Sequence, residues 1–164
     1  MTPDVAGSKD WDAAITRTAT WVKFSDRATT SEFFLFNTHF DHIGIEARKN
    51  SAQLILDQIE EITSTSPVVL VGDFNVTPDT ETYAVVTAEM KDAMMVSEMP
   101  HHGPSDTFYG FEVTGEPGVR IDYIFVNDHV RVLRHATLSD NWDGAFASDH
   151  LAVFAELQMG LSGR

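Results

Sequence analysis

The sequence predicts an α+β fold in which a mostly antiparallel sheet carries its helices on one face. Segments rich in aromatic and β-branched residues, typical of strands, occur early and late in the chain. Between them lie an amphipathic helix pattern and a continuous apolar run, Val68 to Val71. At 164 residues with 43% apolar content, the chain is long enough for one domain with a sizeable core and too short for two.

The chain opens with an extended lead-in followed by a predicted hairpin. Residues 1–12 mix Pro, Gly and polar residues without periodicity, which is typical of an extended segment. Thr16 to Phe24 and Glu32 to Phe40 are rich in aromatic and β-branched residues, so both are expected to be strands. The polar run from Ser25 to Ser31 is the expected hairpin connection, and the two strands are therefore antiparallel.

A helix and a buried strand are predicted next. After Gly44, apolar residues recur at the spacing that forms one stripe on a helix, and Ser64 and Pro67 end the pattern. The apolar run from Val68 to Val71 then predicts a strand that is covered on both faces. The stripe consists of Ala52, Ile55, Leu56, Ile59 and Ile62.

Shorter elements are predicted for the remaining residues. Tyr83 to Ala88 fits a short helix and Asp92 to Val96 a short strand, whereas Pro100 to Gly118 is a long loop of the kind that is commonly functional. Three further strands are expected: Arg120 to Asn127, Val130 to Leu138 and Leu151 to Met159.

Composition restricts the function classes. The chain has no cysteine, so disulfides and thiolate metal sites are excluded, and a metal would be held by Asp, Glu, His, Asn and water. Such ligands suit Mg²⁺ or Mn²⁺. A formal net charge of −14 disfavours unaided binding to duplex nucleic acid, although an acidic nuclease site can bind phosphate through its metal.

The sequence shows no membrane span and no signal peptide. No stretch approaches the roughly 18 uninterrupted apolar residues of a spanning helix, and the first residues lack the pattern of a basic segment followed by an apolar one. We therefore expect a soluble chain, and its location in the cell stays open.

Polar side chains follow two of the predicted strands at the point where each strand ends. In Glu32 to Phe40, period-two alternation places Asn37 and His39 on one face and Phe34, Phe36 and Phe40 on the other. The buried strand ends with Asp73 and Asn75, whose side chains project the same way at a strand end where ligand sites are favoured. Taken alone, His39 is better read as a structural histidine, and Asp73 with Asn75 can equally form an Asx turn.

Two further candidates lie near the end of the chain. Asp122 is flanked by apolar strand residues, and a carboxylate that is partly buried needs a partner such as a histidine. The sequence Ser148-Asp149-His150 precedes the last strand and supplies a second acid and an imidazole. We expect Asp122 and His150 to be hydrogen-bonded.

Four short motifs occur in order along the chain: the Asn-Thr-His strand end, the Gly-Asp-Phe-Asn strand end, the Ile-Asp-Tyr strand and the Ser-Asp-His strand entry. Together they resemble the endonuclease/exonuclease/phosphatase superfamily, whose fold is deoxyribonuclease I-like. The resemblance implies a phosphodiesterase or phosphatase, possible nucleases included, that uses Mg²⁺ or Mn²⁺. It implies that His39 hydrogen-bonds the phosphate, Asp73 orients or deprotonates the attacking water, and Asn75 contacts phosphoryl oxygens. Asp149, with Asp73, is implied on the metal side, and His150, oriented by Asp122, contacts the phosphate or shares the acid-base role. Asn37 and Arg120 are the candidate substrate-binding residues.

The resemblance also implies that residues 1–164 form a single partial domain, the C-terminal half of a four-layer fold. The first half of that fold supplies an Asn and the principal metal-binding Glu, and neither Glu32 nor Glu46 lies in that context. We expect the isolated chain to be inactive. We also expect the sheet face carrying Phe34, Phe36 and Phe40 or their neighbours to be uncovered, so that it binds the missing half or self-associates.

Two alternatives from other classes remain. The chain can be a truncated or degenerate family member that serves as a non-catalytic binding or assembly module, and the completeness of the metal site distinguishes this from an enzyme. The other alternative is a histidine site for Zn²⁺, although the residues involved match no helical zinc motif. Its candidate ligands are His39, His42, His101 and His102. The sequence does not identify the substrate, which can be DNA, RNA, a phosphoinositide, a phospholipid or a small phosphate.

Overall fold

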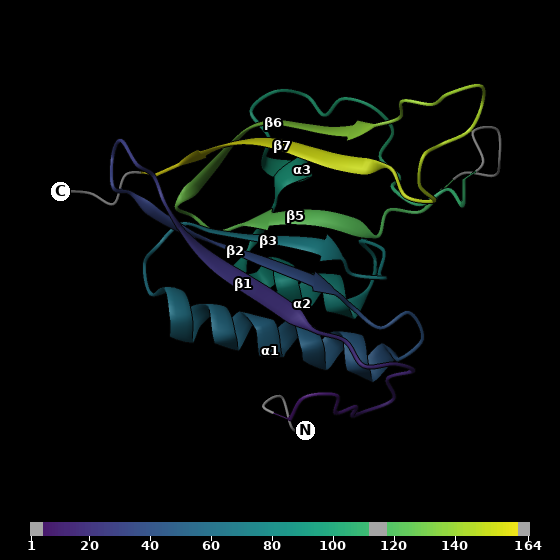
Figure 1. Cartoon of the computed structure of the whole chain (residues 1–164), viewed down its shortest axis with the longest axis horizontal. Coiled ribbons are helices and arrows are strands. Elements are labelled where there is room, and N and C mark those ends of the chain that lie inside the picture. Colours follow the sequence, from purple (N-terminus) through teal and green to yellow (C-terminus); the bar gives the residue numbers. More distant parts are fainter. Residues whose placement is uncertain (1–4, 112–117, 161–164) are drawn as a thin grey trace.

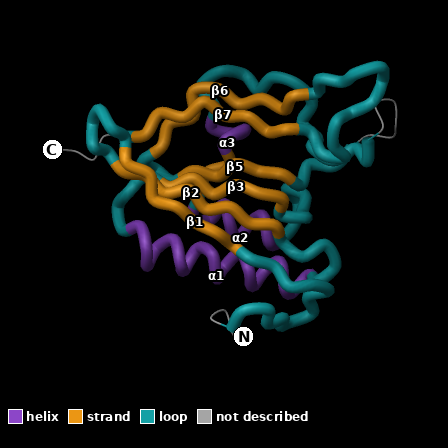
Figure 2. Tube along the Cα trace, in the orientation of Figure 1, coloured by secondary structure: helices purple, strands orange, loops and turns teal. Residues whose placement is uncertain are grey.

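Two sheets and three helices are formed by the residues that the computed structural model describes, 5–111 and 118–160 (Figures 1 and 2). The larger sheet has the strand order β1-β2-β3-β5-β4, and the smaller one pairs β6 with β7. In the larger sheet β2 and β3 are parallel and the other pairs are antiparallel, which confirms the predicted fold class. The strands are β1 (Ala19–Ser25), β2 (Glu32–His39), β3 (Val68–Asp73), β4 (Lys91–Asp92), β5 (Asp122–Val126), β6 (Val130–Leu138) and β7 (Ala152–Met159), and the helices are α1 (Ile45–Thr63), α2 (Glu81–Glu89) and α3 (Ala93–Val96).

The main core lies between the larger sheet and helices α1 and α2, which cover one face of it (Figure 1). The predicted stripe on α1 packs here, against alternate residues of β2, β3 and β5. Phe34, Phe36 and Phe40 belong to this core and are at most 5% exposed. The expectation that these three phenylalanines lie on an uncovered face is therefore wrong, because α1 and α2 cover them.

The neighbouring residues of the same strands face the other side of the sheet, where β6 and β7 pack as a second sheet rather than extending the first. Val69 and Val126 are buried in this second core. Its coverage decreases toward the β1 edge, where Val22 and Phe24 are each 42% exposed. The uncovered apolar surface is thus the β1 end of the face opposite the helices.

The predicted strand from Asp92 to Val96 is wrong. Only Asp92 belongs to the two-residue strand β4, and the following residues form α3. The Asp92 side chain accepts a hydrogen bond from the Met94 backbone N–H, as an N-cap does, and a second from Arg120 Nη2 at 2.7 Å. A buried aspartate that caps a helix and pairs with an arginine ends the strand.

The described part of the lead-in, residues 5–12, contains turns and joins the helix layer, whereas residues 1–4 lie outside the described residues. Asp12 Oδ1 accepts a hydrogen bond from the Ala47 backbone N–H at 2.8 Å in the first turn of α1. The buried Asp41 carboxylate accepts backbone N–H bonds from Ala14, just after the lead-in, and from Gly44, just before α1. Burial opposes ionisation of Asp41, but these donors outweigh it and hold its pKa well below the usual range.

Across the described residues, no helix combines the length and apolar character that a membrane crossing requires.

Gly72 permits the close approach of β3 to β2, and its replacement gives a testable prediction. Its φ is +147°, and a Cβ at this position would lie 1.9 Å from the Thr38 carbonyl oxygen. Gly72→Ala should therefore lower the free energy of unfolding in urea by about 3 kcal/mol or more, since backbone atoms have to move. Gly144→Ala is the matched control, because Gly144 has a φ of +79° with no atom within 4 Å of its Cβ position. The control should cost only about 1 kcal/mol, and equal losses in the two variants would contradict this account.

Candidate active site

Three polar residues form one row across the larger sheet. In the strand register His39 lies opposite Asp73, and Asp73 lies opposite Asp122. All three therefore project from the face opposite the main helices, at one end of β2, β3 and β5. His39 Nε2 lies 3.1 Å from Asp73 Oδ2, so the first two members of the row are in direct contact.

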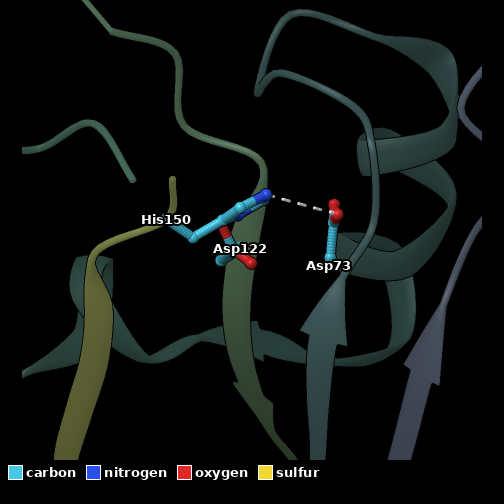
Figure 3. A group of neighbouring side chains, drawn as sticks. All are labelled: Asp73, Asp122 and His150. Carbon is cyan, nitrogen blue, oxygen red and sulfur yellow. Dashed lines mark hydrogen bonds and ion pairs between the residues drawn. The ribbon is translucent and has the colours of Figure 1, made fainter. Parts of the chain in front are cut away.

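His150 reaches the row from the loop that precedes β7 (Figure 3). Its Nδ1 atom lies 2.8 Å from Asp122 Oδ2, which confirms the predicted pair. In the neutral imidazole, an Nδ1–H that donates to Asp122 leaves Nε2 as the free ring nitrogen. That Nε2 atom faces Asp73, with a distance of 4.0 Å to Oδ2. Residues 39, 73, 122 and 150 thus converge, as the sequence predicted.

Asn75 is held beside the row by its own turn. Its φ is +51°, and its backbone N–H donates to Asp73 Oδ1 at 2.8 Å. The side-chain Nδ2 donates to the Phe40 carbonyl oxygen at 3.1 Å and lies 3.4 Å from Asp73 Oδ2. The Asx turn and the site position, which were alternatives from sequence, occur together here.

Burial and charge shift the proton affinities of two members of the site. Burial raises the pKa of Asp73, and the nearby Asp122 carboxylate raises it further. Burial alone would lower the pKa of His150, but the hydrogen bond and negative charge of Asp122 outweigh it and raise that pKa. The site thus combines a carboxylate that resists ionisation with an imidazole that favours protonation, as acid-base sites often do.

The same residues can hold a cation. Asp73, Asp122 and His150 each offer a ligand atom, and these atoms lie within 4.8 Å of one another. Two carboxylates at this separation repel each other, as the raised pKa of Asp73 reflects, and a cation between them would relieve the repulsion. The two carboxylates of this set are ligands that suit Mg²⁺ or Mn²⁺.

Three predicted site residues are not members of this cluster. Asp149, expected on the metal side, adjoins His150 in sequence but is absent from the three-residue set found among the described residues. Arg120 is only 8% exposed and donates to Asp92, so its guanidinium is committed to a buried ion pair rather than to substrate. Asn37 shares the face of His39 but lies one row away, opposite Val71.

The histidines of the zinc alternative do not gather. His39 contacts Asp73, and His42 Nδ1 lies 3.3 Å from Arg17 Nη2. His101 pairs instead with His135, at 2.9 Å between the Nδ1 atoms. His102 forms a backbone bridge to β6. The described residues therefore do not support the predicted zinc site.

Two supporting residues were missed from sequence. The buried Thr107 hydroxyl accepts the backbone N–H groups of Ile121 and Asp122, both at 3.1 Å, and fixes the start of β5. The Phe108 ring lies 4.9 Å from the His150 ring, centroid to centroid. Both lie in the long loop predicted from Pro100 to Gly118, of which residues 112–117 lie outside the described residues. Its sequence has no periodicity, so only its length signalled a function.

Comparisons with known proteins show the family of the chain and its fold. The sequence model of the Endonuclease/Exonuclease/phosphatase family matches residues 7–150. An endonuclease/exonuclease/phosphatase structure from Bacteroides vulgatus is 40% identical, with a TM-score of 0.90 over 96% of this chain and 61% of that one. A mannosyl-6-phosphatase from Bacteroides thetaiotaomicron is 32% identical, with a TM-score of 0.86 over 93% of this chain and 61% of that one.

A more distant likeness extends the fold comparison. The catalytic domain of human Nocturnin is 20% identical and has a TM-score of 0.68 over 87% of this chain and 53% of that one, which shows a shared fold alone. The comparison with curated proteins gave no match. The chain spans about three-fifths of the length of the two Bacteroides structures.

Proposed function

The chain belongs to the endonuclease/exonuclease/phosphatase family, and from this premise we propose that it carries the catalytic row of a metal-dependent phosphatase that acts on a small phosphoester. One observation carries the proposal. His39, Asp73 and Asp122 lie in register on three strands, and His150 is hydrogen-bonded to the last of them. This arrangement places an acid-base pair and hydrogen-bond donors around a single point, as in-line attack on phosphorus requires.

Each residue has a distinct proposed role. The Asp73 carboxylate orients a water molecule and accepts its proton, for which its raised pKa makes it a stronger base. His39 donates to the phosphoryl oxygens, and the Asn75 amide hydrogen that is not bonded to the Phe40 carbonyl oxygen can join it. His150, held in one tautomer by Asp122, presents Nε2 to the phosphate and stabilises negative charge there when it is protonated.

Mg²⁺ or Mn²⁺ is the proposed cofactor. The carboxylates of Asp73 and Asp122 are the described groups that would contribute to holding it while His150 faces the phosphate, and Asp149 stays a predicted further ligand. A bound cation of this kind neutralises charge that develops on phosphoryl oxygens. Two carboxylates, one of which is hydrogen-bonded to His150, hold Mg²⁺ weakly because this ion gives up its water reluctantly.

We further propose that full activity requires polypeptide in addition to this chain. Two facts support this: the chain spans about three-fifths of the Bacteroides vulgatus structure, and apolar side chains are exposed at the β1 end of the face that carries the row. The proposed partner is a complementing segment that covers this surface, for which the part of the B. vulgatus protein that the chain does not match is a practical substitute. Self-association through the same surface is the alternative.

The proposed substrate is a phosphorylated sugar. Two observations support it: a net charge of −14, which disfavours nucleic acid, and the 32% identity to a mannosyl-6-phosphatase. The test is a screen of the chain with its complementing segment, in Mn²⁺, for phosphate release from hexose 6-phosphates and for cleavage of nucleotides, DNA, RNA and phospholipids. We expect kcat/KM for a hexose 6-phosphate to exceed the others by at least ~10²-fold, since a site that pairs substrate hydroxyls rejects analogues that lack them. Preferential cleavage of a phosphodiester would contradict the phosphatase assignment.

A further inference from the structure

Four aromatic side chains, two exposed and two half-buried, lie on two loops beside His150. We call Tyr109, Phe111, Trp142 and Phe146 the aromatic rim. Phe111 is 56% exposed and Trp142 is 67% exposed, and the Tyr109 and Phe146 rings lie 6.1 Å apart between centroids. Figure 1 shows the two loops together at the right-hand end of the molecule, past the end of β6 and before the start of β7. Aromatic rings left in solvent beside a polar site are typical of ligand-binding surfaces.

The rim is attached to the catalytic row by backbone hydrogen bonds. The backbone N–H groups of Tyr109 and Gly110 donate to the Asp149 carbonyl oxygen at 3.0 and 3.1 Å. Leu151 N–H donates to the Thr107 carbonyl oxygen at 2.7 Å, and Phe108 forms a backbone bridge with His150. These bonds flank His150 on both sides in sequence, so the Tyr109 end of the rim lies next to the row.

Trp142 is presented by a tight turn. Its backbone N–H and C=O groups exchange two 3.0 Å hydrogen bonds with Ala145. The two residues between them, Asp143 and Gly144, have φ values of +51° and +79°, as a two-residue hairpin turn requires. A preformed turn loses little conformational freedom when a ligand binds, so the indole can contribute most of its contact energy to affinity.

The charge of the two loops selects the kind of ligand. Residues 105–111 and 139–149 contain Asp106, Asp140, Asp143 and Asp149 and no Lys or Arg. Burial raises the pKa of Tyr109, and the charge of Asp106 raises it further, so the tyrosine hydroxyl stays a neutral donor. Such a surface repels a second phosphate group. Its rings can pack against an apolar face, and its carboxylates can accept hydrogen bonds from several hydroxyls.

We propose that the aromatic rim binds the uncharged ring of a hexose phosphate whose single phosphate lies on the row of His39, Asp73 and Asp122. A hexose ring has an apolar C–H face and a periphery of hydroxyls, which matches the aromatic and acidic character of the rim. The inference rests on the proposed phosphatase function and assigns its substrate specificity to the rim. A nucleotide, whose base also stacks, is the competing occupant, and its affinity is an outcome of the test.

Saturation-transfer NMR on the 164-residue chain tests the assignment without requiring catalysis. The probes are methyl α-mannoside, which has the ring without the phosphate, mannose 6-phosphate and AMP. We expect saturation of the ring protons of both sugars, and a dissociation constant for mannose 6-phosphate that rises about tenfold in Trp142→Ala, as the loss of one aromatic contact predicts. Trp11→Ala is the matched control, because Trp11 is also exposed, at 39%, and lies outside both loops, and it should leave the constant unchanged.

A second variant separates this inference from the proposed function. His39→Ala should weaken binding of mannose 6-phosphate and leave methyl α-mannoside unaffected, because His39 belongs to the row and not to the rim. If His39→Ala weakens the binding of neither sugar while Trp142→Ala still weakens it, the phosphate site is contradicted and the rim is supported. Unchanged sugar binding in Trp142→Ala, absence of sugar binding to the unaltered chain, or tighter binding of AMP than of mannose 6-phosphate each overturns the rim assignment.

Discussion

The isolated 164-residue chain should release phosphate from a hexose 6-phosphate at least ~10³-fold more slowly, in Mg²⁺ or Mn²⁺, than the same chain with its complementing segment. We expect the complementing segment to supply a carboxylate ligand, without which the cation stays mostly hydrated, and to cover apolar side chains such as Val22 and Phe24. On the proposal above, one added polypeptide would have both effects.

The measurement is the steady-state rate of the purified chain before and after the complementing segment is added, with sedimentation to follow association. The chain carrying Asp73→Asn is the control, since it should stay inactive with the segment present. Metal-dependent turnover by the isolated monomer would refute the requirement. A complex that forms without gaining activity would favour the non-catalytic assembly module.

Asp122→Asn should lower kcat of the complemented chain by about 10³-fold with little change in KM. The carboxylate accepts from His150 Nδ1 at 2.8 Å, whereas an asparagine amide can donate to that nitrogen and so stabilise the opposite tautomer. The substitution also removes the negative charge that raises the pKa of His150, so less imidazolium is available to stabilise negative charge on the phosphate. Substrate contacts are left in place, so the loss should fall on turnover.

The matched control for this prediction is Asp57→Asn, because Asp57 is exposed on α1 and pairs with Gln53. It should leave kcat within about twofold of the unaltered value. Unfolding in urea should be compared for both variants, so that a loss of folded protein is not mistaken for a loss of rate. An unchanged rate in Asp122→Asn would remove this residue from the catalytic row.

Much of the fold was predictable because periodicity is a local property of the sequence. The aromatic residues of Glu32 to Phe40 identified β2, and the apolar run after Pro67 identified β3. One strand was predicted from Asp92 to Val96, whereas the structure has the short strand β4 followed by helix α3. This difference was not predictable, because the residue that pairs with Asp92 is Arg120, 28 residues further on. Similarly, no local pattern reveals that β6 and β7 leave the first sheet and cover its face.

The site was predictable in part for a related reason. His39, Asp73 and Asp122 follow from strand ends and motifs, and the predicted bond to His150 is present. Arg120 was misassigned because a cation in a candidate phosphate site suggests substrate binding, and only the tertiary structure shows its guanidinium buried against Asp92. Thr107 was missed because its function is to accept two backbone N–H groups, which a sequence pattern does not record.

The position of the row within the sheet determines how the site responds to local opening of the fold. β3 is hydrogen-bonded on both sides, whereas β1 is an edge strand in which all seven residues are exposed. Local unfolding begins where few buried contacts hold a segment, so β1 should fray while β2, β3 and β5 remain paired. The three residues of the row therefore keep their register while β1 unfolds locally. The site geometry should be lost only when the central strands unfold, and local unfolding of the edge strand should leave it intact.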